Sequence, residues 1–270
     1  MLIAQLTDCH IVEPGGTMAD RVDPGPGLAR AVEYLNSLGD EVDLVLATGD
    51  LVNDGRSEQY DELQRLLAPL GAPLLPLPGN HDDRSEFRRR FPDLPGGRPH
   101  DPIDHVVDRD EIRLVCLDTK VPGQHSGELD DDQLGWLEAA LGEGGGRPTL
   151  VVQHHPPFAS GIDAMDKYGL KGADVEAAIV ERHRNVIGVV AGHYHRAIHT
   201  TVGGRPAFAC PSTAVQLRAR LGPGPTTYSS DPAALALHVV ERSTITTHVV
   251  QLVSGETWVP SWESEEASAG

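Results

Sequence analysis

The sequence predicts an α/β protein in which helices flank layered sheets. Apolar runs typical of strands alternate with stretches whose leucines recur at helical spacing, and near the amino terminus the order is strand, helix, strand, helix. Beyond residue 195 the pattern changes to β-branched runs separated by turn residues, which predicts hairpins. At 270 residues the chain is long enough for one large domain or two small ones.

Five of the strand-like runs end in residue types that bind metals. They are Leu2 to His10, Asp43 to Asp50, Pro73 to His81, Thr149 to His155 and Asn185 to His195. A sixth run, Ile112 to Leu117, leads into a loop. In open α/β sheets, sites form where the carboxyl ends of strands gather along one edge. We therefore expect these polar strand ends to lie together.

Helical patterns occupy four segments between the strands. They are Leu28 to Leu38, Glu58 to Leu70, Asp130 to Leu141 and Ala173 to His183. In the second segment one face is marked by leucines at helical spacing: Leu63, Leu66, Leu67 and Leu70. The third begins with Asp130 and Gln133 three residues apart, which resembles a capping box.

Turn residues and composition predict the carboxy-terminal segments. Gly203-Gly204 indicates a turn, and Leu235 to Val240 and Thr244 to Leu252 indicate strands. The Gly, Pro, Thr and Ser of Gly222 to Pro232 predict a loop, and Glu263 to Gly270 predicts a disordered acidic tail.

The formal charge of −18 speaks against a general surface for nucleic acid or anionic membranes, which needs Lys and Arg facing phosphates. The basic cluster Arg84, Arg88, Arg89 and Arg90 could help to hold an anion, but its spacing favours the solvated face of a short helix. An anionic substrate therefore requires a local source of positive charge.

The cysteines and the amino terminus indicate a cytoplasmic protein. Cys9, Cys116 and Cys210 are odd in number and lack metal-motif spacing, which favours a reducing compartment without disulfides. No run of about eighteen apolar residues predicts a membrane span. The amino terminus reads as a strand and lacks the basic leader of a signal peptide.

The polar strand ends supply donors for more than one metal ion. They offer three side-chain oxygens (Asp8, Asp50, Asn80) and four imidazoles (His10, His154, His193, His195). Each alone could be a helix cap, a core histidine or a surface residue, but five coincident strand ends favour a site. Residues two apart in an extended chain point the same way, so we expect Cys9 to turn away between its neighbours and to be buried.

Seven donors are too many for one tetrahedral zinc and suit two ions sharing a bridging ligand. Oxygen and nitrogen ligands without a thiolate fit Fe, Mn, Zn or Co.

The motifs Asp-x-His, Gly-Asp, Gly-Asn-His, His before Pro, and Gly-His-x-His occur in this order from Asp8 to His195, over about 70% of the chain. This set resembles the calcineurin-like metallophosphoesterases. The details TGDLVNDG, PGNHDD, HHPP and AGHYH are most similar to the branch of class III cyclic-nucleotide phosphodiesterases and glycerophosphodiesterases.

The resemblance implies a four-layer α/β/β/α sandwich of two mixed sheets flanked by helices, as one catalytic domain over residues 1–262 in which 211–232 is a lid or an oligomerisation segment. It also implies which metal ion each donor residue binds. Asp8, His10 and His195 would hold one metal, Asn80, His154 and His193 the other, and Asp50 would bridge both.

The same resemblance implies a role for His81, and the residues themselves indicate roles for its polar neighbours. His81 would face the phosphate as a catalytic group beside Asp50. Asp82 and Asp83 would cap the next helix or orient His81, and His155 would pack beside the ligands without binding metal.

The expected function is hydrolysis of a small phosphodiester, either a 3′,5′-cyclic nucleotide or a glycerophosphodiester, by a metal-bound hydroxide. The alternatives are a phosphomonoesterase or protein phosphatase on the same metal core, and a metal-dependent binding protein with weak turnover. Residues that choose the substrate would lie in Pro156 to Gly172 and Cys210 to Pro232. Relatives in this branch lead us to expect a homo-oligomer.

Overall fold

The computed structural model describes residues 1–94, 100–110, 112–253, 255–256 and 258–260. Two mixed sheets dominate it. The first has the strand order β15 (Thr244–Gln251), β14 (Ala234–Glu241), β1 (Leu2–Leu6), β2 (Leu44–Thr48) and β3 (Leu74–Leu77). The second has the order β10 (Ile198–Val202), β11 (Arg205–Ala209), β9 (Val186–Ala191), β7 (Thr149–Gln153), β5 (Ile112–Leu117) and β4 (His105–Arg109).

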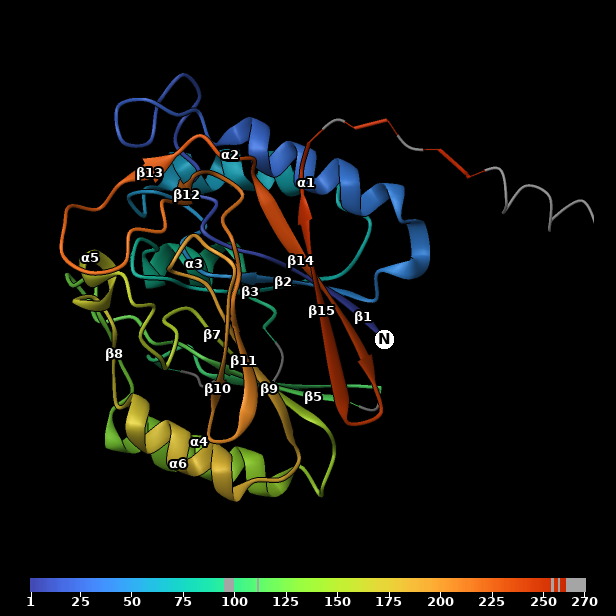
Figure 1. Cartoon of the computed structure of the whole chain (residues 1–270), viewed down its shortest axis with the longest axis vertical. Coiled ribbons are helices and arrows are strands. Elements are labelled where there is room, and N and C mark those ends of the chain that lie inside the picture. Colours follow the sequence, from blue (N-terminus) through green and yellow to red (C-terminus); the bar gives the residue numbers. More distant parts are fainter. Residues whose placement is uncertain (95–99, 111, 254, 257, 261–270) are drawn as a thin grey trace, which may run out of the picture.

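The two sheets stack face to face, and helices cover their outer faces (Figure 1). The first sheet is covered by α1 (Gly25–Ser37), α2 (Ser57–Leu67) and α3 (Arg84–Arg90), and the second by α4 (Asp131–Glu143) and α6 (Ala173–Arg182). The alternating directions of the side chains along β2 show why the sheet is covered on both faces. Val45 and Ala47 pack with the helices, whereas Leu44 and Leu46 pack between the sheets. The predicted four-layer fold is confirmed.

Every strand that carries a predicted ligand is shorter than its apolar run. β1 ends at Leu6, β2 at Thr48 and β3 at Leu77, and β7 and β9 also stop before their histidines. The polar residues therefore lie in the segments that follow the strands, which frees their backbone to turn.

The four predicted helices form, with shifted ends. The first begins three residues early, the second ends at Leu67, and the fourth ends one residue before His183. Half of the predicted capping box for α4 is confirmed, because the Asp130 carboxylate accepts a hydrogen bond from the backbone N–H of Gln133 at 2.9 Å. The Gln133 side chain does not return to the cap and donates instead to Asp104 and to the carbonyl oxygen of Asp118.

The basic cluster lies on α3, and each arginine is paired with a carboxylate. Arg84 contacts Asp118, Arg88 contacts Asp101, Arg89 contacts Glu86 and Arg90 contacts Asp61. The cluster is therefore balanced by acids, but it is not the fully solvated face that the spacing favoured, because the side chains of Arg84 and Arg90 are only 14% and 11% exposed.

The remaining elements are short. They are the 3₁₀ turn η1 (Gly39–Glu41), α5 (Asp163–Asp166), and the two-stranded pairs β6 (Gly127–Glu128) with β8 (Leu170–Lys171) and β12 (Gln216–Leu217) with β13 (Tyr228–Ser229). The predicted loop Gly222 to Pro232 thus contains a strand, because Tyr228 pairs with Leu217. Gly203-Gly204 joins β10 to β11 as predicted. The predicted tail Glu263 to Gly270 lies outside the described residues.

All three cysteines are buried and unpaired. Burial raises the pKa of the Cys9 thiol to about 12, which fits a packing role. Within the described ranges, no helix combines the length and apolarity that crossing a membrane requires.

Glu176 is a fully buried carboxyl group at the start of α6. Its Oε2 lies 3.3 Å from Gln153 Nε2, and its Oε1 lacks a hydrogen-bond partner among the described residues. Burial raises the pKa of Glu176 from 4.5 to about 8. The folded protein thus keeps a proton that the unfolded chain releases above pH 4.5.

Stability should therefore fall as the pH rises from about 4.5 to about 8, by up to about 5 kcal/mol. We expect Glu176→Gln to unfold at higher urea concentration than the wild type at pH 8.5, with a much smaller advantage at pH 5. Exposed Glu143→Gln on α4 is the control. An equal effect of Glu176→Gln at both pH values would contradict the burial argument.

Candidate metal centre

The predicted ligands sit where the backbone turns sharply after each strand. Asp8, His10, Asp50, His193 and His195 all have positive φ, between 45° and 67°. They make up five of the nine non-glycine residues with this conformation in the described part of the chain. Such a conformation costs on the order of 1–3 kcal/mol each and concentrates at functional sites.

The argument from an extended chain was therefore wrong in its geometry. Asp8 and His10 reach the site from left-handed backbone beyond β1, and not as alternate residues of a strand. Cys9 between them is fully buried, as expected.

Two glycines of the motifs are required by close packing. A Cβ at Gly49 would lie 2.4 Å from His154 Nδ1, and one at Gly79 would lie 2.2 Å from the backbone nitrogen of Asp50. Since real Cβ atoms do not approach so closely, glycine lets the two strand-end segments meet.

The first group of donors brings together both ends of the motif set. His195 Nε2 lies 3.3 Å from Asp8 Oδ1 and 3.1 Å from His10 Nε2. His195 Nδ1 lies 2.9 Å from the carbonyl oxygen of Val215, which can only accept, so Nδ1 carries the proton and Nε2 faces Asp8. Asp8 Oδ1 is buried and lacks a hydrogen-bond partner among the described residues.

The second group lies on the other side of Asp50. His154 Nε2 is 3.1 Å from Asn80 Oδ1, and His154 Nδ1 is 2.9 Å from the carbonyl oxygen of Thr48. His193 Nε2 is buried and has no hydrogen-bond partner within the described residues.

Asp50 lies between the two groups. Its Oδ2 is 3.6 Å from His10 Nε2 and 3.4 Å from His154 Nε2, and its Oδ1 accepts the backbone N–H of His81 at 2.8 Å. One carboxylate oxygen therefore faces a donor of each group, which is the arrangement a bridging ligand needs.

The electrostatics of the centre favour added positive charge. Burial opposes ionisation of Asp50, but His154 and His81 hold its pKa well below 3.8. Burial lowers the pKa of His154, yet Asp50 raises it to about 9. Burial lowers the pKa of His10 to about 3, so that this imidazole is neutral and can bind a cation. Unpartnered buried acceptors beside ionised carboxylates fit metal ions.

His81 contacts both the centre and the solvent-accessible pocket beside it. Its Nδ1 lies 2.6 Å from the carbonyl oxygen of Asn53, so Nδ1 donates and Nε2 is left for another partner. A ring nitrogen of His81 also lies within 4.8 Å of donor atoms of His10 and Asp50. His81 could therefore be a ligand or a phosphate contact by distance alone.

Asp83 caps α3 as predicted, because its Oδ1 accepts from the backbone N–H groups of Ser85 and Glu86. Asp82 was expected to cap the same helix or to orient His81, and its hydrogen bonds serve neither purpose. Its carboxylate accepts from the N–H of Gly79 at 2.8 Å, the N–H of Leu51 at 3.1 Å and the Tyr60 hydroxyl at 2.9 Å.

The buried Asp82 carboxylate thus links, through hydrogen bonds, the two segments that carry Asp50 and Asn80. Burial, reinforced by Asp50, raises its pKa to about 6. Sequence reasoning could not find this role, since Tyr60 and Leu51 lie 22 and 31 residues earlier in the chain.

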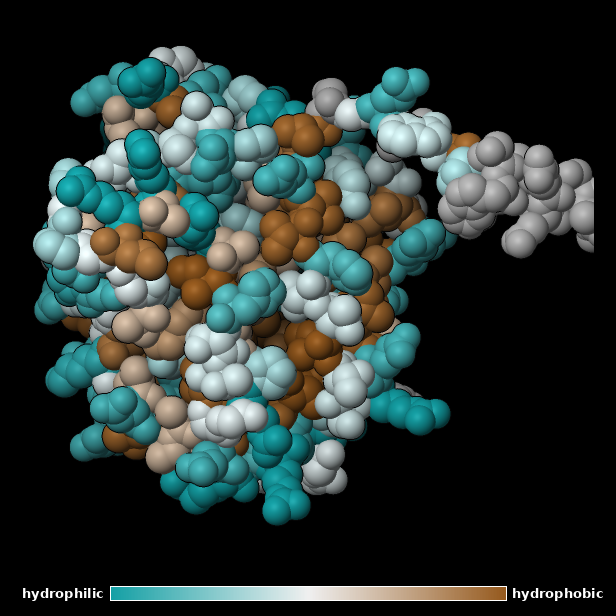
Figure 2. Space-filling model, viewed as in Figure 1, coloured by the Kyte–Doolittle hydropathy of each residue, from teal (hydrophilic) through white to brown (hydrophobic). Residues whose placement is uncertain are grey.

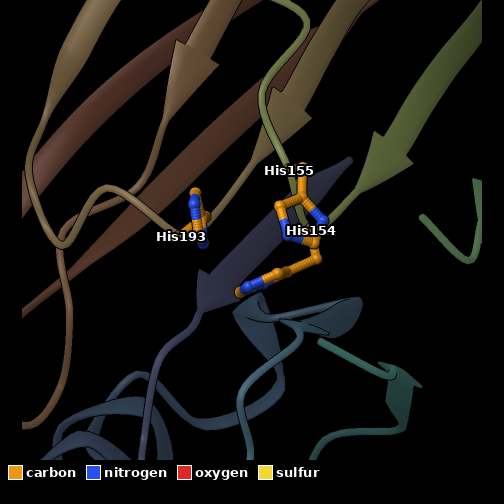
Figure 3. Close-up of side chains that lie close together, drawn as sticks. All are labelled: His154, His155 and His193. Carbon is orange, nitrogen blue, oxygen red and sulfur yellow. The ribbon is translucent and has the colours of Figure 1, made fainter. Parts of the chain in front are cut away.

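His155 lies beside two predicted ligands. Figure 3 shows His154 and His155 just after β7, next to His193 after β9, and ring nitrogens of the three lie within 4.8 Å of one another. Both nitrogens of His155 are occupied, however. Nδ1 lies 2.8 Å from the Thr119 hydroxyl, and Nε2 lies 3.0 Å from the carbonyl oxygen of His125. The expectation that His155 packs without binding metal agrees with this geometry.

We expect His155→Phe to keep its bound metal while kcat/KM for diesters falls about 10- to 100-fold, the usual effect of losing a supporting hydrogen bond. The reason is that His155 holds the backbone of His125, which lines the pocket. Metal analysis and kinetics check this, with exposed His248→Phe as control. In a His125→Ala background the further loss should be much smaller. Loss of metal from His155→Phe would instead make His155 a ligand.

A pocket of about 330 Å³ opens onto the centre. Its inner side is formed by predicted site residues, including His81, Asn80 and Asp50. Its outer wall adds five residues that motif reasoning missed: His125, Met165, Tyr168, Thr226 and Tyr228. Met165, Tyr168, Thr226 and Tyr228 fall inside the two loops in which substrate-selecting residues were expected. No motif marks His125, and only its place in the fold reveals it.

The family profile described as calcineurin-like phosphoesterase matches residues 1–197, which include every predicted ligand. This chain belongs to the calcineurin-like phosphoesterases.

Curated relatives of this calcineurin-like phosphoesterase are similar over most of its length. A glycerophosphodiester phosphodiesterase of Enterobacter lignolyticus is 34% identical over 221 residues, which cover 80% of this chain and 79% of the relative. A 3′,5′-cyclic adenosine monophosphate phosphodiesterase of Pseudomonas aeruginosa is 33% identical, covering 87% and 82%. A cAMP/cGMP dual specificity phosphodiesterase of Mycobacterium tuberculosis is 32% identical, covering 95% and 81%.

Solved structures share the fold at much lower identity. A dimetal phosphatase from Danio rerio superposes with a TM-score of 0.67 at 16% identity, covering 92% of this chain and 98% of that one. A purple acid phosphatase from yellow lupin gives 0.69 at 13% identity, covering 96% of this chain and 52% of that one. These likenesses show the four-layer architecture alone.

Proposed function

We propose that this calcineurin-like phosphoesterase is a metal-dependent phosphodiesterase that hydrolyses a small phosphodiester, a 3′,5′-cyclic nucleotide or a glycerophosphodiester. The observation that carries the proposal is the position of Asp50, whose Oδ2 faces one imidazole of each donor group. The relatives named as phosphodiesterases support the same reaction class.

The seven donors predicted from the sequence would hold two metal ions, with Asp8, His10 and His195 on one, Asn80, His154 and His193 on the other, and Asp50 on both. When bound, such ions supply positive charge for the phosphoryl group and lower the pKa of water. The donor set suits Fe, Mn, Zn or Co, because it offers imidazoles and oxygens, and no cysteine belongs to the donor groups formed by the described residues.

His81 is the group of this chain best placed to handle a proton. The Asn53 carbonyl fixes the proton on Nδ1, so Nε2 faces the pocket. As an imidazolium, His81 would donate from Nε2 to the oxygen of the departing alcohol and would stabilise the phosphoryl charge before that.

The size of the pocket favours a small phosphate ester over a phosphoprotein substrate. About 330 Å³ is at the lower end of the range for small-molecule sites, and it leaves little room for the phosphorylated segment of a protein. A binding protein with weak turnover would have no use for a free His81 nitrogen beside the centre.

The test is a substrate panel on metal-reconstituted protein. It compares bis(p-nitrophenyl) phosphate, p-nitrophenyl phosphate, 3′,5′-cAMP and sn-glycerophosphodiesters. We expect kcat/KM for the diester to exceed that for the monoester. A preference for p-nitrophenyl phosphate would establish the phosphomonoesterase instead, and stoichiometric binding without turnover would establish the binding protein.

We also propose the homo-oligomer that the sequence led us to expect, and we assign its interface to a specific surface. β15 is the outer strand of its sheet and carries no Asp, Glu, Lys or Arg. Figure 2 shows apolar surface around the β14–β15 hairpin, where Val249 is 40% exposed. Uncharged edge strands tend to pair with other chains, so we propose pairing of β15 with its copy. A monomer by light scattering at micromolar concentration would contradict it. The cytoplasmic location stays a prediction.

A further inference from the structure

The outer wall of the pocket shows what the substrate carries beyond its phosphate. This wall consists of His125, Met165, Tyr168, Thr226 and Tyr228, and none of them is a carboxylate, an ammonium or a guanidinium. The rings and the thioether offer stacking surface to a planar group, and the wall supplies no counter-ion for a charged one.

Tyr168 stands on the side of the pocket that carries His81. Its ring centroid lies 5.4 Å from that of His125, which in turn lies 5.7 Å from that of His81. The Lys167 ammonium lies 4.6 Å from the centroid of the Tyr168 ring. Lys167 is exposed and does not line the pocket. A cationic head group such as ethanolamine or choline would find no carboxylate among the five residues of the outer wall.

Tyr228 stands on the side that carries His195, and the two ring centroids are 5.7 Å apart. It belongs to the segment after β12, whereas Tyr168 follows α5. The two segments are joined where the N–H of Gly222 donates to the carbonyl oxygen of Gly161 at 3.2 Å. The tyrosines thus come from two connected loops on different sides of one pocket.

We propose that Tyr168 and Tyr228 form a nucleobase subsite, which makes a cyclic nucleotide rather than a glycerophosphodiester the preferred substrate class of the proposed phosphodiesterase. The base stacks on one or both rings, and the cyclic phosphate reaches the donors around Asp50. This inference rests on the proposed function, because it extends the same pocket outward from the metal centre.

The subsite does not discriminate between purine bases. Its hydroxyl groups, on Thr226 and the two tyrosines, can each donate or accept a hydrogen bond, so they suit the amino group of adenine and the carbonyl of guanine alike. We expect kcat/KM for 3′,5′-cAMP and 3′,5′-cGMP to agree within about tenfold.

The experiment measures the ratio of kcat/KM for 3′,5′-cAMP to that for sn-glycero-3-phosphoethanolamine. Tyr168→Ala and Tyr228→Ala should each lower this ratio by about 5- to 100-fold, the effect of removing a stacking ring. The Phe variants should restore most of it, because stacking needs the ring and not the hydroxyl. Leu221→Ala, at an exposed residue of the same loop outside the pocket wall, is the matched control. Calorimetric affinity for 5′-AMP should follow the same order.

The outcomes separate the subsite from the underlying function. Equal losses on both substrates would mean that the tyrosines shape the pocket without binding a base, and would overturn the subsite. Turnover of glycerophosphodiesters without turnover of cyclic nucleotides would also overturn it, and would leave the phosphodiesterase intact. Failure to hydrolyse any diester with metal bound would instead contradict the proposed function.

Discussion

Replacing Asp50 with alanine is expected to lower kcat for diesters by on the order of 10⁴-fold or more and to reduce the bound metal from two ions to one or none. The reason is geometric. Asp50 Oδ2 lies within 3.6 Å of His10 Nε2 and within 3.4 Å of His154 Nε2, so its loss weakens both donor groups at once. The charge stabilisation that two ions supply is worth several kcal/mol in the transition state.

Asp8→Ala is the matched comparison, because Asp8 belongs to one donor group. It should lose metal mainly from the group with His10 and His195, and excess metal should restore part of its rate. Asp50→Asn controls for folding, since the amide oxygen can still accept from the His81 N–H. Elemental analysis and kinetics decide the matter. One metal per chain in the fully active wild type would end the two-metal interpretation.

His81→Ala is expected to keep both metals while kcat falls by roughly 10²- to 10⁴-fold, the usual range for losing an acid–base group. The hydrogen bond from His81 Nδ1 to the Asn53 carbonyl directs Nε2 away from the backbone and into the pocket. The alternative, that His81 is a ligand, is open by distance, and the metal content of the variant decides it.

Asn80→Ala should behave differently from its neighbour. Asn80 Oδ1 lies 3.1 Å from His154 Nε2, so its removal takes an oxygen from the second donor group. Occupancy of one metal should fall, and added metal should rescue part of the rate. The backbone carbonyl of Asn80, which accepts from Lys120 Nζ at 2.6 Å, is unchanged by the substitution.

Substrates with different leaving groups distinguish two roles of His81, which are to protonate the departing oxygen and to bind the phosphoryl group. The loss in His81→Ala should be smaller for bis(p-nitrophenyl) phosphate than for a glycerophosphodiester, because p-nitrophenolate departs without a proton. Equal losses on both substrates would mean that His81 binds the phosphoryl group and is not the acid. Loss of metal would overturn the assignment of the donors around PGNHDD.

The layered α/β architecture follows from local patterns. Helical spacing of leucines, alternating apolar strands and the Asp130 cap are properties of neighbouring residues, and all three appear in the structure with ends shifted by a few residues. The donor types are also local, since each motif follows an apolar run. Local patterns were therefore enough to predict a layered α/β protein and to propose seven candidate ligands, whereas the four-layer arrangement was implied by the resemblance of the motif set.

Only the tertiary structure decided how those ligands meet. His10 and His195 are 185 residues apart in the chain, yet their Nε2 atoms lie 3.1 Å apart. The left-handed turns that aim them exist because the strands end early and glycines such as Gly79 let the following segments touch. An alternating-strand argument cannot predict this, because it assumes an extended backbone.

The same limit applies to the supporting residues and the pocket wall. His155 was expected to pack without binding metal, but only the structure names its partners, Thr119 and His125, which lie 36 and 30 residues away in the chain. No motif marks Tyr168 or Tyr228 in the sequence, and only the contact between their two segments of the chain shows that both line one pocket. Apolar periodicity and motif spacing are properties of residues close together in the sequence, and can be predicted from it. Contacts between distant loops form only when the sheets and helices have packed.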